Sequence, residues 1–209
     1  MNLHLLNMFF HTKAKTMTWN KAKNINISKE EHHRIYGAEW SIGLDQYNYL
    51  KSLGLKSSDN VCDIGCGVGR FGIHVLKFLA NNRYVGIDGS KASLDIFKNY
   101  EIPMNHLEDS GCNLYNIDIT KEYIPASISS ATGFHFIIAF SVYNHISNHS
   151  ISLDFIYKNL AEDGLLITTF AAPKNYKDYN LELIKTDTTF STYGNQKIDW
   201  FVFTKSNKK

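Results

Sequence analysis

The sequence has few cysteines, and this shortage excludes two classes of protein. Its three cysteines, Cys62, Cys66 and Cys112, are an odd number, and they lack the spacing of paired metal ligands. They therefore argue against a disulfide framework and against a structural metal site. An odd number of unpaired thiols fits a reducing compartment. We expect a cytoplasmic protein that needs no metal.

The sequence also lacks a long apolar run and a strong charge of either sign. An apolar run near the amino terminus, residues 3–10, is interrupted by His4 and Asn7 and has no basic residue before it. It is too short to span a membrane and does not have the form of a secretory signal. The formal net charge is only +2 over 209 residues, so no footprint for nucleic acid or for an anionic membrane is indicated. A hydrophobic content of 44% is sufficient for one domain with a sizeable core.

The most informative segment present is residues 61–71, where an apolar strand pattern leads into a turn with one acidic residue and three alternating glycines. A helical pattern begins directly afterwards. Glycine allows a tight turn and a close approach of backbone to ligand, because it has no Cβ. The helix that follows directs free N–H groups and the positive end of its dipole toward the loop. The segment therefore predicts a site for a nucleotide-like ligand.

Two kinds of ligand fit this loop. Residues 67–72 have the form G-x-G-x-x-G, and Asp88 lies about 20 residues further on, as in a dinucleotide site. In a dinucleotide site, however, the first glycine directly follows the strand, and here the strand already ends at Ile64. Counted from the strand end, the pattern is D-x-G-x-G-x-G, and its additional carboxylate, Asp63, suits a cationic amino group better than a pyrophosphate. S-adenosylmethionine (SAM) has such an amino group and no phosphate, so the pattern favours SAM over NAD.

The segments that follow extend this pattern, and together they resemble the class I SAM-dependent methyltransferases from about residue 41 to the carboxyl end. The resembling segments are residues 63–69, 84–90, 115–119, 134–146 and 160–170. In that family they wrap the methionine part of SAM, hold the ribose hydroxyls, meet the adenine amino group, border the transferring methyl, and form the fifth strand. One such motif alone is a weak signal, whereas five in the family's order and spacing are specific to it.

The resemblance implies a set of cofactor-binding residues. Asp88 corresponds to the acidic residue that holds the ribose, and Asp118 to the one that meets the adenine amino group. The implied set is Asp63, Gly65, Cys66, Gly67, Asp88, Gly89, Asp118, Ile119 and Phe140. Simpler roles stay open, because Asp63 could serve only the tight turn and Asp118 could be an ordinary acidic residue at a strand end. Asp88 could cap the next helix, although Ser90 and Ser93 offer hydroxyls for that purpose.

Methyl transfer from a sulfonium is an in-line displacement, so it asks mainly for alignment and exclusion of water. His145 is the candidate general base, since a histidine titrates near neutrality and this one follows the predicted fourth strand. Similar small-molecule methyltransferases, including phosphoethanolamine N-methyltransferases, pair a histidine near this place with a tyrosine from an amino-terminal lid, for which Tyr36 is the candidate. The alternatives are that His145 caps the following helix, or that it binds a metal with His149, for which no third ligand is apparent.

Strand and helix patterns alternate along most of the chain, as in a doubly wound α/β fold. Helices are expected at residues 46–53, 71–81, 91–100 and 150–160, and strands at 60–64, 84–88, 113–119, 134–140, 165–170, 183–193 and 197–204. We expect a seven-stranded, mostly parallel sheet that ends in an antiparallel hairpin. Residues 1–40 are expected to form an amino-terminal extension and helical lid, and residues 41–209 the methyltransferase domain. Because residues 171–182 leave little room for a substrate-binding insert, the lid would come from the amino-terminal segment.

Absent motifs narrow the substrate. Nucleic-acid amino-methyltransferases carry [D/N/S]-P-P-[Y/F] after the fourth strand, whereas residues 141–144 contain no proline. Protein arginine methyltransferases need a pair of glutamates there, and residues 140–149 contain none. By elimination the acceptor is a small molecule, such as a sugar, amino alcohol, phospho-metabolite or natural product. Two alternatives stay open: a SAM-binding partner subunit without its own turnover, and an NAD-dependent oxidoreductase.

Overall fold

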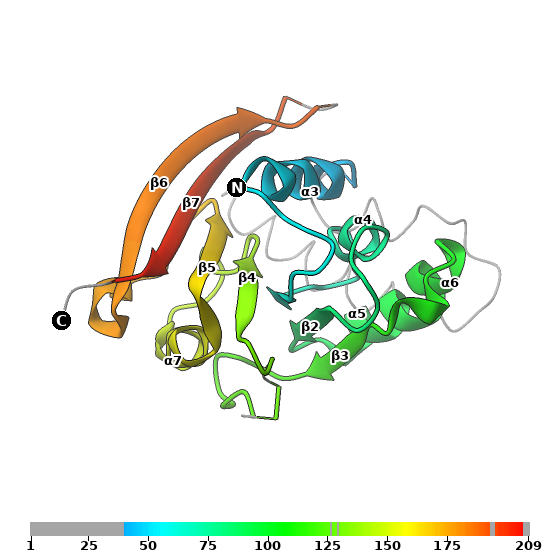
Figure 1. Cartoon of the computed structure of the whole chain (residues 1–209), viewed down its shortest axis with the longest axis horizontal. Coiled ribbons are helices and arrows are strands. Elements are labelled where there is room, and N and C mark those ends of the chain that lie inside the picture. The colour runs from blue at the N-terminus through cyan, green and yellow to red at the C-terminus, as the bar shows by residue number, and fades with distance from the viewer. Residues whose placement is uncertain (1–39, 126, 129, 193–194, 207–209) are drawn as a thin grey trace, which may run out of the picture.

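A seven-stranded sheet runs through the centre of the molecule (Figure 1). The computed structural model describes residues 40–206, except residues 126, 129, 193 and 194. The strand order is β3-β2-β1-β4-β5-β7-β6. The strands are β1 (Val61–Ile64), β2 (Tyr84–Asp88), β3 (Asn113–Asn116), β4 (Phe134–Ala139), β5 (Leu160–Thr169), β6 (Leu181–Phe190) and β7 (Lys197–Lys205). Strands β1 to β5 pair in parallel, and β7 runs antiparallel to both β5 and β6.

Strand β1 is the point at which the strand order reverses. Its four residues are all buried, and it pairs with β2 on one side and β4 on the other. Strands β2 and β3 follow outward from β1 in one direction, and β4 and β5 follow in the other. In an open α/β sheet, ligands bind beyond the carboxyl ends of the strands at such a reversal. The fold therefore directs attention to the residues that follow β1, β2 and β4.

Three helical segments cover one face of the sheet. They are α3 (Ile42–Ser52), α4 (Gly72–Leu76) and α5 (Lys91–Ile96), the last continuing through a π-helical turn, Phe97–Glu101, into α6 (Ile102–Met104). Their apolar side chains form one core with the sheet, in which Leu50, Val75 and Phe97 are fully buried. Tyr49 of α3 stacks on Trp200 of β7 with ring centroids 3.9 Å apart. This face holds the helix that follows the glycine loop.

The opposite face has a thinner cover. Helix α7 (Ser150–Asn159) packs there, with Leu153 and Ile156 fully buried. Between β3 and β4, the described residues form no helix, and their isoleucines pack directly on the sheet instead. These are Ile117, Ile119, Ile124 and Ile128. Between β5 and β6 a single 3-10 turn, Tyr176–Tyr179, places the ring of Tyr176 4.9 Å from that of Phe203. On this face, apolar side chains from loops therefore cover the parts of the sheet that α7 does not cover.

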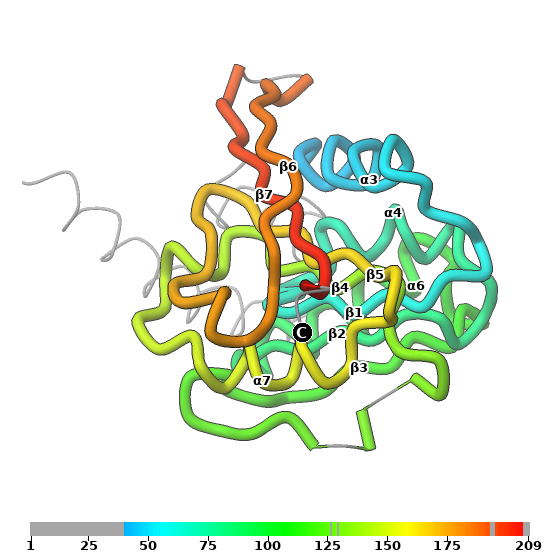
Figure 2. Tube along the Cα trace, turned by 60° about the vertical axis from the view of Figure 1, so that its left-hand side comes forward, coloured from blue at the N-terminus to red at the C-terminus, as the bar shows by residue number. Residues whose placement is uncertain are grey.

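The β6–β7 hairpin extends beyond the neighbouring strand, β5. Only residues 200–203 of β7 pair with β5, so the strands continue past the carboxyl end of β5 (Figure 2). The tip lies beside α3, where the Thr192 N–H donates to the Asp45 carboxylate over 3.0 Å and the Thr192 hydroxyl donates to it as well. The indole N–H of Trp200 donates to Thr189 across the hairpin over 2.8 Å. The overhang is therefore attached to α3 through Thr192, and its two strands are joined to each other through Trp200 and Thr189.

The expected fold class is confirmed, and the differences lie at element boundaries. Strand β3 stops at Asn116, because the carboxylate of Asp118 accepts from the Thr120 N–H and starts a turn. Helix α4 ends at Leu76, where the next bond is a tighter one from the Phe78 N–H to the Val75 carbonyl. Strand β5 begins at Leu160. The turn expected before residue 165 is present only as a shift in register between β4 and β5, at Phe134 to Phe136.

Of the predicted amino-terminal lid, residues 1–40, only Trp40 is among the described residues. Tyr36 lies outside them. Trp40 packs against the core of the helical face. Within residues 40–206, as far as they are described, no helix combines the length and the apolar character that crossing a membrane requires.

Two glycines with similar backbone angles allow a test of how the glycine loop packs. Gly69 has φ +85° and Gly54 has φ +95°. A Cβ at Gly69 would overlap the Phe97 ring, whereas one at Gly54 would meet nothing within 4 Å. We expect Gly54→Ala to cost about 1–2 kcal/mol of unfolding free energy from backbone strain. Gly69→Ala should cost a further ~1–3 kcal/mol from overpacking.

Urea unfolding of both variants, followed by circular dichroism, measures the difference. Equal losses in the two variants would show that Phe97 does not hold the loop.

Candidate functional site

The glycine loop after β1 is held by the end of β2. The N–H groups of Gly65 and Cys66 both donate to the Ile87 carbonyl, at 2.7 and 3.1 Å. The N–H of Gly67 donates to the Asp88 carboxylate at 2.9 Å. Gly65, Gly67 and Gly69 all have positive φ, at +76°, +57° and +85°. The alternating glycines thus supply the left-handed backbone that brings consecutive amides onto one neighbouring strand.

This arrangement bears on the identity of the ligand. A dinucleotide site uses the loop amides and the helix end to bind a pyrophosphate. Here the amides of Gly65, Cys66 and Gly67 are already paired within the protein. Two carboxylates, Asp63 and Asp88, flank the same loop and disfavour a phosphate by charge. The geometry therefore agrees with the glycine spacing in favouring a cofactor that carries an amino group and a ribose.

Asp88 is oriented by two backbone amides. Its Oδ2 accepts from the Gly67 N–H and its Oδ1 from the Ser90 N–H, at 2.9 and 2.7 Å. The cap of α5 is Ser90, whose hydroxyl accepts from the Ser93 N–H at 3.3 Å, so Asp88 is not needed for that purpose. A carboxylate has about four lone-pair directions, so hydroxyl donors can join the two amides. The Asp88 carboxylate therefore lies beside the glycine loop with both oxygens oriented by the backbone, and its ribose role stays a prediction.

Asp63 is buried behind the loop, with only 3% of its surface exposed. The hydroxyl of Tyr84 donates to its Oδ2 at 2.7 Å. Burial raises the pKa of Asp63 to about 7, the Tyr84 hydrogen bond lowers it, and the nearby charge of Asp88 raises it. This carboxyl group changes its charge near neutral pH, where a cationic ligand would favour the ionised form.

Asp118 is engaged by its own turn. Its carboxylate accepts from the N–H and the hydroxyl of Thr120 at 3.0 and 2.6 Å, and from Lys121 Nζ at 2.8 Å. The Lys121 hydrogen bond is the largest of the causes that lower the pKa of Asp118 to about 2. Gly89 lies against it, because a Cβ at Gly89 would be 3.4 Å from the Asp118 Cα. Gly89 and Asp118 therefore lie side by side after β2 and β3, and the Asp118 carboxylate has a structural role in its own turn.

The remaining members of the predicted cofactor set are apolar and face the protein interior. Cys66 is buried, and a Cβ at Gly86 would lie 2.9 Å from its Sγ, so the Cys66 side chain points at β2. Ile119 is buried in the core of the thinner face. Phe140 is half-buried between Phe71, 5.2 Å away, and Trp200, 5.8 Å away, measured between ring centroids. Any contact of Cys66 with a ligand would come from its backbone.

The loop after β4 approaches the glycine loop. A Cβ at Gly65 would lie 2.5 Å from Val142 Cγ2, so only glycine fits there. Ser141 has φ +56°, a conformation that costs a non-glycine residue strain, and its N–H donates to the Thr169 hydroxyl at 2.9 Å. The ends of β1, β4 and β5 are thus joined at this edge. His145 belongs to the loop so positioned.

The two histidines of this loop have different environments. His145 is exposed, its N–H donates to the Val142 carbonyl at 2.9 Å, and its Nε2 lies 3.2 Å from the side-chain amide of Asn144. It does not cap α7, which begins at Ser150 with Asn148 accepting from the Ser150 N–H.

His149 is buried, and both of its ring nitrogens are used by the backbone. Its Nδ1 accepts from the Lys174 N–H at 2.7 Å, and its Nε2 donates to the Ile146 carbonyl at 3.1 Å. It therefore ties the loop after β4 to the segment after β5. Neither ring nitrogen is left for the metal ligation considered from the sequence, and no cluster of three metal-binding side chains occurs among the described residues.

Sequence reasoning missed Tyr84 as a member of the site. Tyr84 is fully buried at the start of β2, two residues before Gly86, which pairs with Asp63. Residues two apart in a strand face the same side, so the Tyr84 ring lies along the vacant face of Gly86 and reaches the neighbouring strand diagonally. An aromatic residue two positions before a glycine, opposite a buried acid, is the signal that would have identified it.

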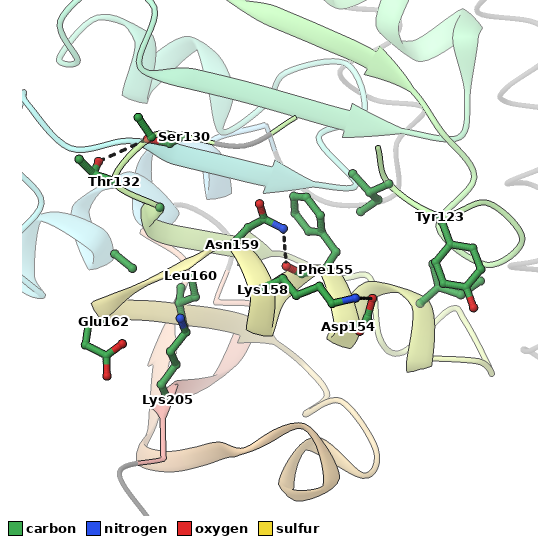
Figure 3. Close-up of a pocket in the computed structure, with 15 residues that line it drawn as sticks. Tyr123, Ser130, Thr132, Asp154, Phe155, Lys158, Asn159, Leu160, Glu162 and Lys205 are labelled. Atoms are coloured by element: carbon green, nitrogen blue, oxygen red, sulfur yellow. Dashed lines mark hydrogen bonds and ion pairs between the residues drawn. The ribbon is translucent and has the colours of Figure 1, made fainter. Parts of the chain in front are cut away.

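One hollow of the structure lies away from these residues. It has a volume of about 650 Å³ and is lined by Gly133, Leu160 and Lys205, at the amino ends of β4 and β5 and the end of β7. Asp154 and Lys158 of α7 form an ion pair on its wall at 2.8 Å (Figure 3). None of the predicted cofactor or catalytic residues lines it. The candidate site is therefore the carboxyl edge of the sheet and not this hollow.

A known family model matches this chain. Residues 32–200 match the model of a family described as a methyltransferase domain. This match covers most of the chain, including the glycine loop, the end of β2 and the loop after β4. A search of curated proteins gave no match.

Solved structures show the same fold at low identity. Magnesium protoporphyrin IX methyltransferase from Synechocystis PCC 6803, solved with bound SAM, is 15% identical, with a TM-score of 0.60 over 92% of this chain and 97% of that one. A SAM-dependent methyltransferase from Aquifex aeolicus is 12% identical, with a TM-score of 0.63 over 85% and 98%. Coclaurine N-methyltransferase, bound to N-methylheliamine and S-adenosylhomocysteine, is 13% identical, with a TM-score of 0.57 over 79% and 70%. By its family match and its fold, the chain belongs to the class I SAM-dependent methyltransferases.

Proposed function

We propose that the protein transfers the methyl group of SAM to an oxygen or nitrogen of a small-molecule acceptor. The observation that carries this proposal is the glycine loop tied to β2 with two carboxylates beside it, Asp63 and Asp88. Asp88 would hold the ribose hydroxyls, and Asp63 would face the amino group of the methionine part. Gly89 and Asp118 would border the adenine.

The chemistry requires alignment more than side-chain reactivity. Bound SAM would supply a methyl group on an electrophilic sulfonium, and an acceptor atom in line with it would displace S-adenosylhomocysteine. Holding both partners in a near-attack geometry can contribute ~7–11 kcal/mol at best. The loops after β1 and β4, in contact at Gly65 and Val142, would hold the two reactants together. A fixed scaffold of this kind suits a reaction that depends on alignment.

His145 is the proposed general base, and Tyr36 its partner from the amino-terminal segment. The position of His145 on an exposed turn next to the cofactor loop supports the proposal. A base there could remove the proton of a hydroxyl or an ammonium as the methyl is transferred. The buried His149 anchors the same turn from behind.

Three observations favour a small-molecule acceptor. The net charge of +2 gives no sign of a strongly basic protein, and the loop after β4 lacks the motifs for nucleic-acid amines or arginine. Two solved structures of the same fold are described as a magnesium protoporphyrin IX methyltransferase and as a coclaurine N-methyltransferase bound to N-methylheliamine. The thiols of Cys62, Cys66 and Cys112 are free, which fits a cytoplasmic location.

A second candidate is a SAM-binding partner subunit without its own turnover. It is favoured by the short connection between β5 and β6, which holds only one 3-10 turn, Tyr176–Tyr179. Such a protein would bind SAM normally and transfer no methyl group by itself.

Calorimetric titration with SAM, S-adenosylhomocysteine and NAD in parallel tests the proposal. We expect binding of the first two and none of NAD. Binding of NAD alone would reject the methyltransferase assignment, and SAM binding without turnover in an acceptor screen would favour the partner subunit.

Asp88→Ala is predicted to abolish measurable SAM binding. Each hydrogen bond to a charged group is worth about 1.5–3 kcal/mol, and the variant removes two ribose contacts together with the anchor of the glycine loop. Calorimetry with SAM and S-adenosylhomocysteine measures the loss. The matched control is Asp154→Ala, which removes an exposed acid paired with Lys158 at the other edge of the sheet. Equal affinity in the Asp88 variant and the control would reject the ribose assignment.

His145→Ala is predicted to lower turnover by roughly 10²–10⁴-fold, the usual contribution of a general base, without weakening SAM binding. The assay measures S-adenosylhomocysteine production with an acceptor identified by screening, and SAM affinity is measured separately. Ser147→Ala, an exposed change in the same turn, is the control. Loss of both activity and SAM affinity, or of neither, would remove His145 from the catalytic residues.

A further inference from the structure

A buried hydrogen bond lies directly behind the glycine loop. Tyr84, fully buried at the start of β2, donates its hydroxyl to Asp63 Oδ2 at 2.7 Å. Asp63 is the last acidic residue before the loop and is 3% exposed. Within the described part of the chain, Tyr84 is the one side chain or amide that donates a hydrogen bond to the Asp63 carboxyl group.

Two glycines leave the room that this hydrogen bond needs. A Cβ at Gly86 would lie 3.2 Å from Tyr84 Cε1, and one at Gly72 would lie 2.9 Å from the Tyr84 hydroxyl oxygen. Phe97 holds the ring from the side, edge-on, with centroids 6.2 Å apart and planes at 80°. The ring therefore has one orientation, and that orientation directs its hydroxyl at Asp63. One strand and two helical segments, through Gly86, Gly72 and Phe97, therefore shape the space around the Tyr84 ring.

The surroundings of Asp63 contain acids and thiols. Asp88 at the end of β2, Cys62 in β1, Cys66 in the loop and Cys112 before β3 all interact with it electrostatically, and none of them is cationic. The Tyr84 hydroxyl therefore stabilises an ionised Asp63, whereas none of these four groups offers it a positive charge. A cation arriving at the loop would meet a buried acceptor that lacks a counter-charge.

We propose that Tyr84 is a positioning residue that keeps the Asp63 carboxylate oriented as the acceptor for the cationic amino group of SAM. The inference rests on the proposed function. Tyr84 does not itself touch the cofactor but acts through Asp63. Its effect is confined to the amino-acid end of SAM, since Asp88 serves the ribose.

The charge of Asp63 supplies a signature that packing alone would not produce. Burial raises its pKa to about 7, and the Tyr84 hydrogen bond opposes that rise. The amino group of SAM requires the ionised carboxylate, so SAM affinity should fall as the pH falls below 7. Loss of the hydroxyl should raise the pKa of Asp63 further and move this fall to higher pH. Above about pH 8 the amino group of SAM loses its own charge, so the informative range lies below that.

The test is calorimetric titration of the full chain and of Tyr84→Phe with SAM between pH 5.5 and 7.5. The parallel probe is 5′-methylthioadenosine, which keeps the adenine and ribose but lacks the amino acid. At pH 7, Tyr84→Phe should bind SAM roughly 10- to 100-fold more weakly, the effect of one hydrogen bond to a charged group. The affinity for 5′-methylthioadenosine should be the same in both proteins and independent of pH.

Asp63→Asn completes the comparison. It should bind SAM weakly at every pH in the range, and adding Tyr84→Phe to it should change nothing further. An unchanged SAM profile in Tyr84→Phe would overturn the proposal, and so would equal losses for SAM and 5′-methylthioadenosine. Should Tyr84→Phe not fold, the pH profile of the full chain still decides, since a SAM affinity that does not vary below pH 7 also overturns it. Failure of the unsubstituted protein to bind SAM at all would instead reject the proposed function.

Discussion

The attachment of the glycine loop to the end of β2 is the constraint on which the site depends. Three consecutive amides, those of Gly65, Cys66 and Gly67, are bound by the Ile87 carbonyl and the Asp88 carboxylate. Because this requires left-handed backbone at alternate positions, the loop must be rich in glycine. The same attachment fixes Asp88 beside the loop and brings Gly65 against Val142 of the loop after β4. One set of hydrogen bonds thus orders the residues predicted to bind the cofactor and positions the loop after β4 beside them.

The sequence was sufficient for the fold class and for the positions of the turns after β1, β2 and β4, because both depend on local patterns; the roles of the residues in those turns stay predictions. Strands β1, β2 and β4 are short apolar runs followed by turn residues, and Asp63 and Asp88 stand at fixed distances from them. These patterns indicate where the strands end and the turns begin, and the turns position Asp63 and Asp88. The resemblance to the family supports what these local patterns leave undecided, namely that the last two strands form an antiparallel hairpin.

What the sequence did not predict depends on side chains that meet across elements. The Tyr84–Asp63 pair joins two strands diagonally, and only the vacant face of Gly86 makes it possible. The structural use of Asp118 depends on Thr120 and Lys121, which compete with the adenine role that its place in the motif implies. The two nitrogens of His149 are used by residues before and after it, including Lys174 beyond β5. Tyr36 lies outside the described residues, so its predicted role stays a prediction.

The burial of Asp63 also makes the stability of the empty protein depend on pH in an unusual direction. An ordinary aspartate in the unfolded chain loses its proton near pH 4, whereas Asp63 in the folded protein keeps it to about pH 7. Over that interval the folded state binds more protons than the unfolded state, so raising the pH lowers the unfolding free energy, by roughly 3–4 kcal/mol if Asp63 acts alone. A bound cation beside Asp63 would reverse part of this loss. The cofactor would then count among the interactions that keep the protein folded at neutral pH, and cells short of SAM would hold a less stable enzyme.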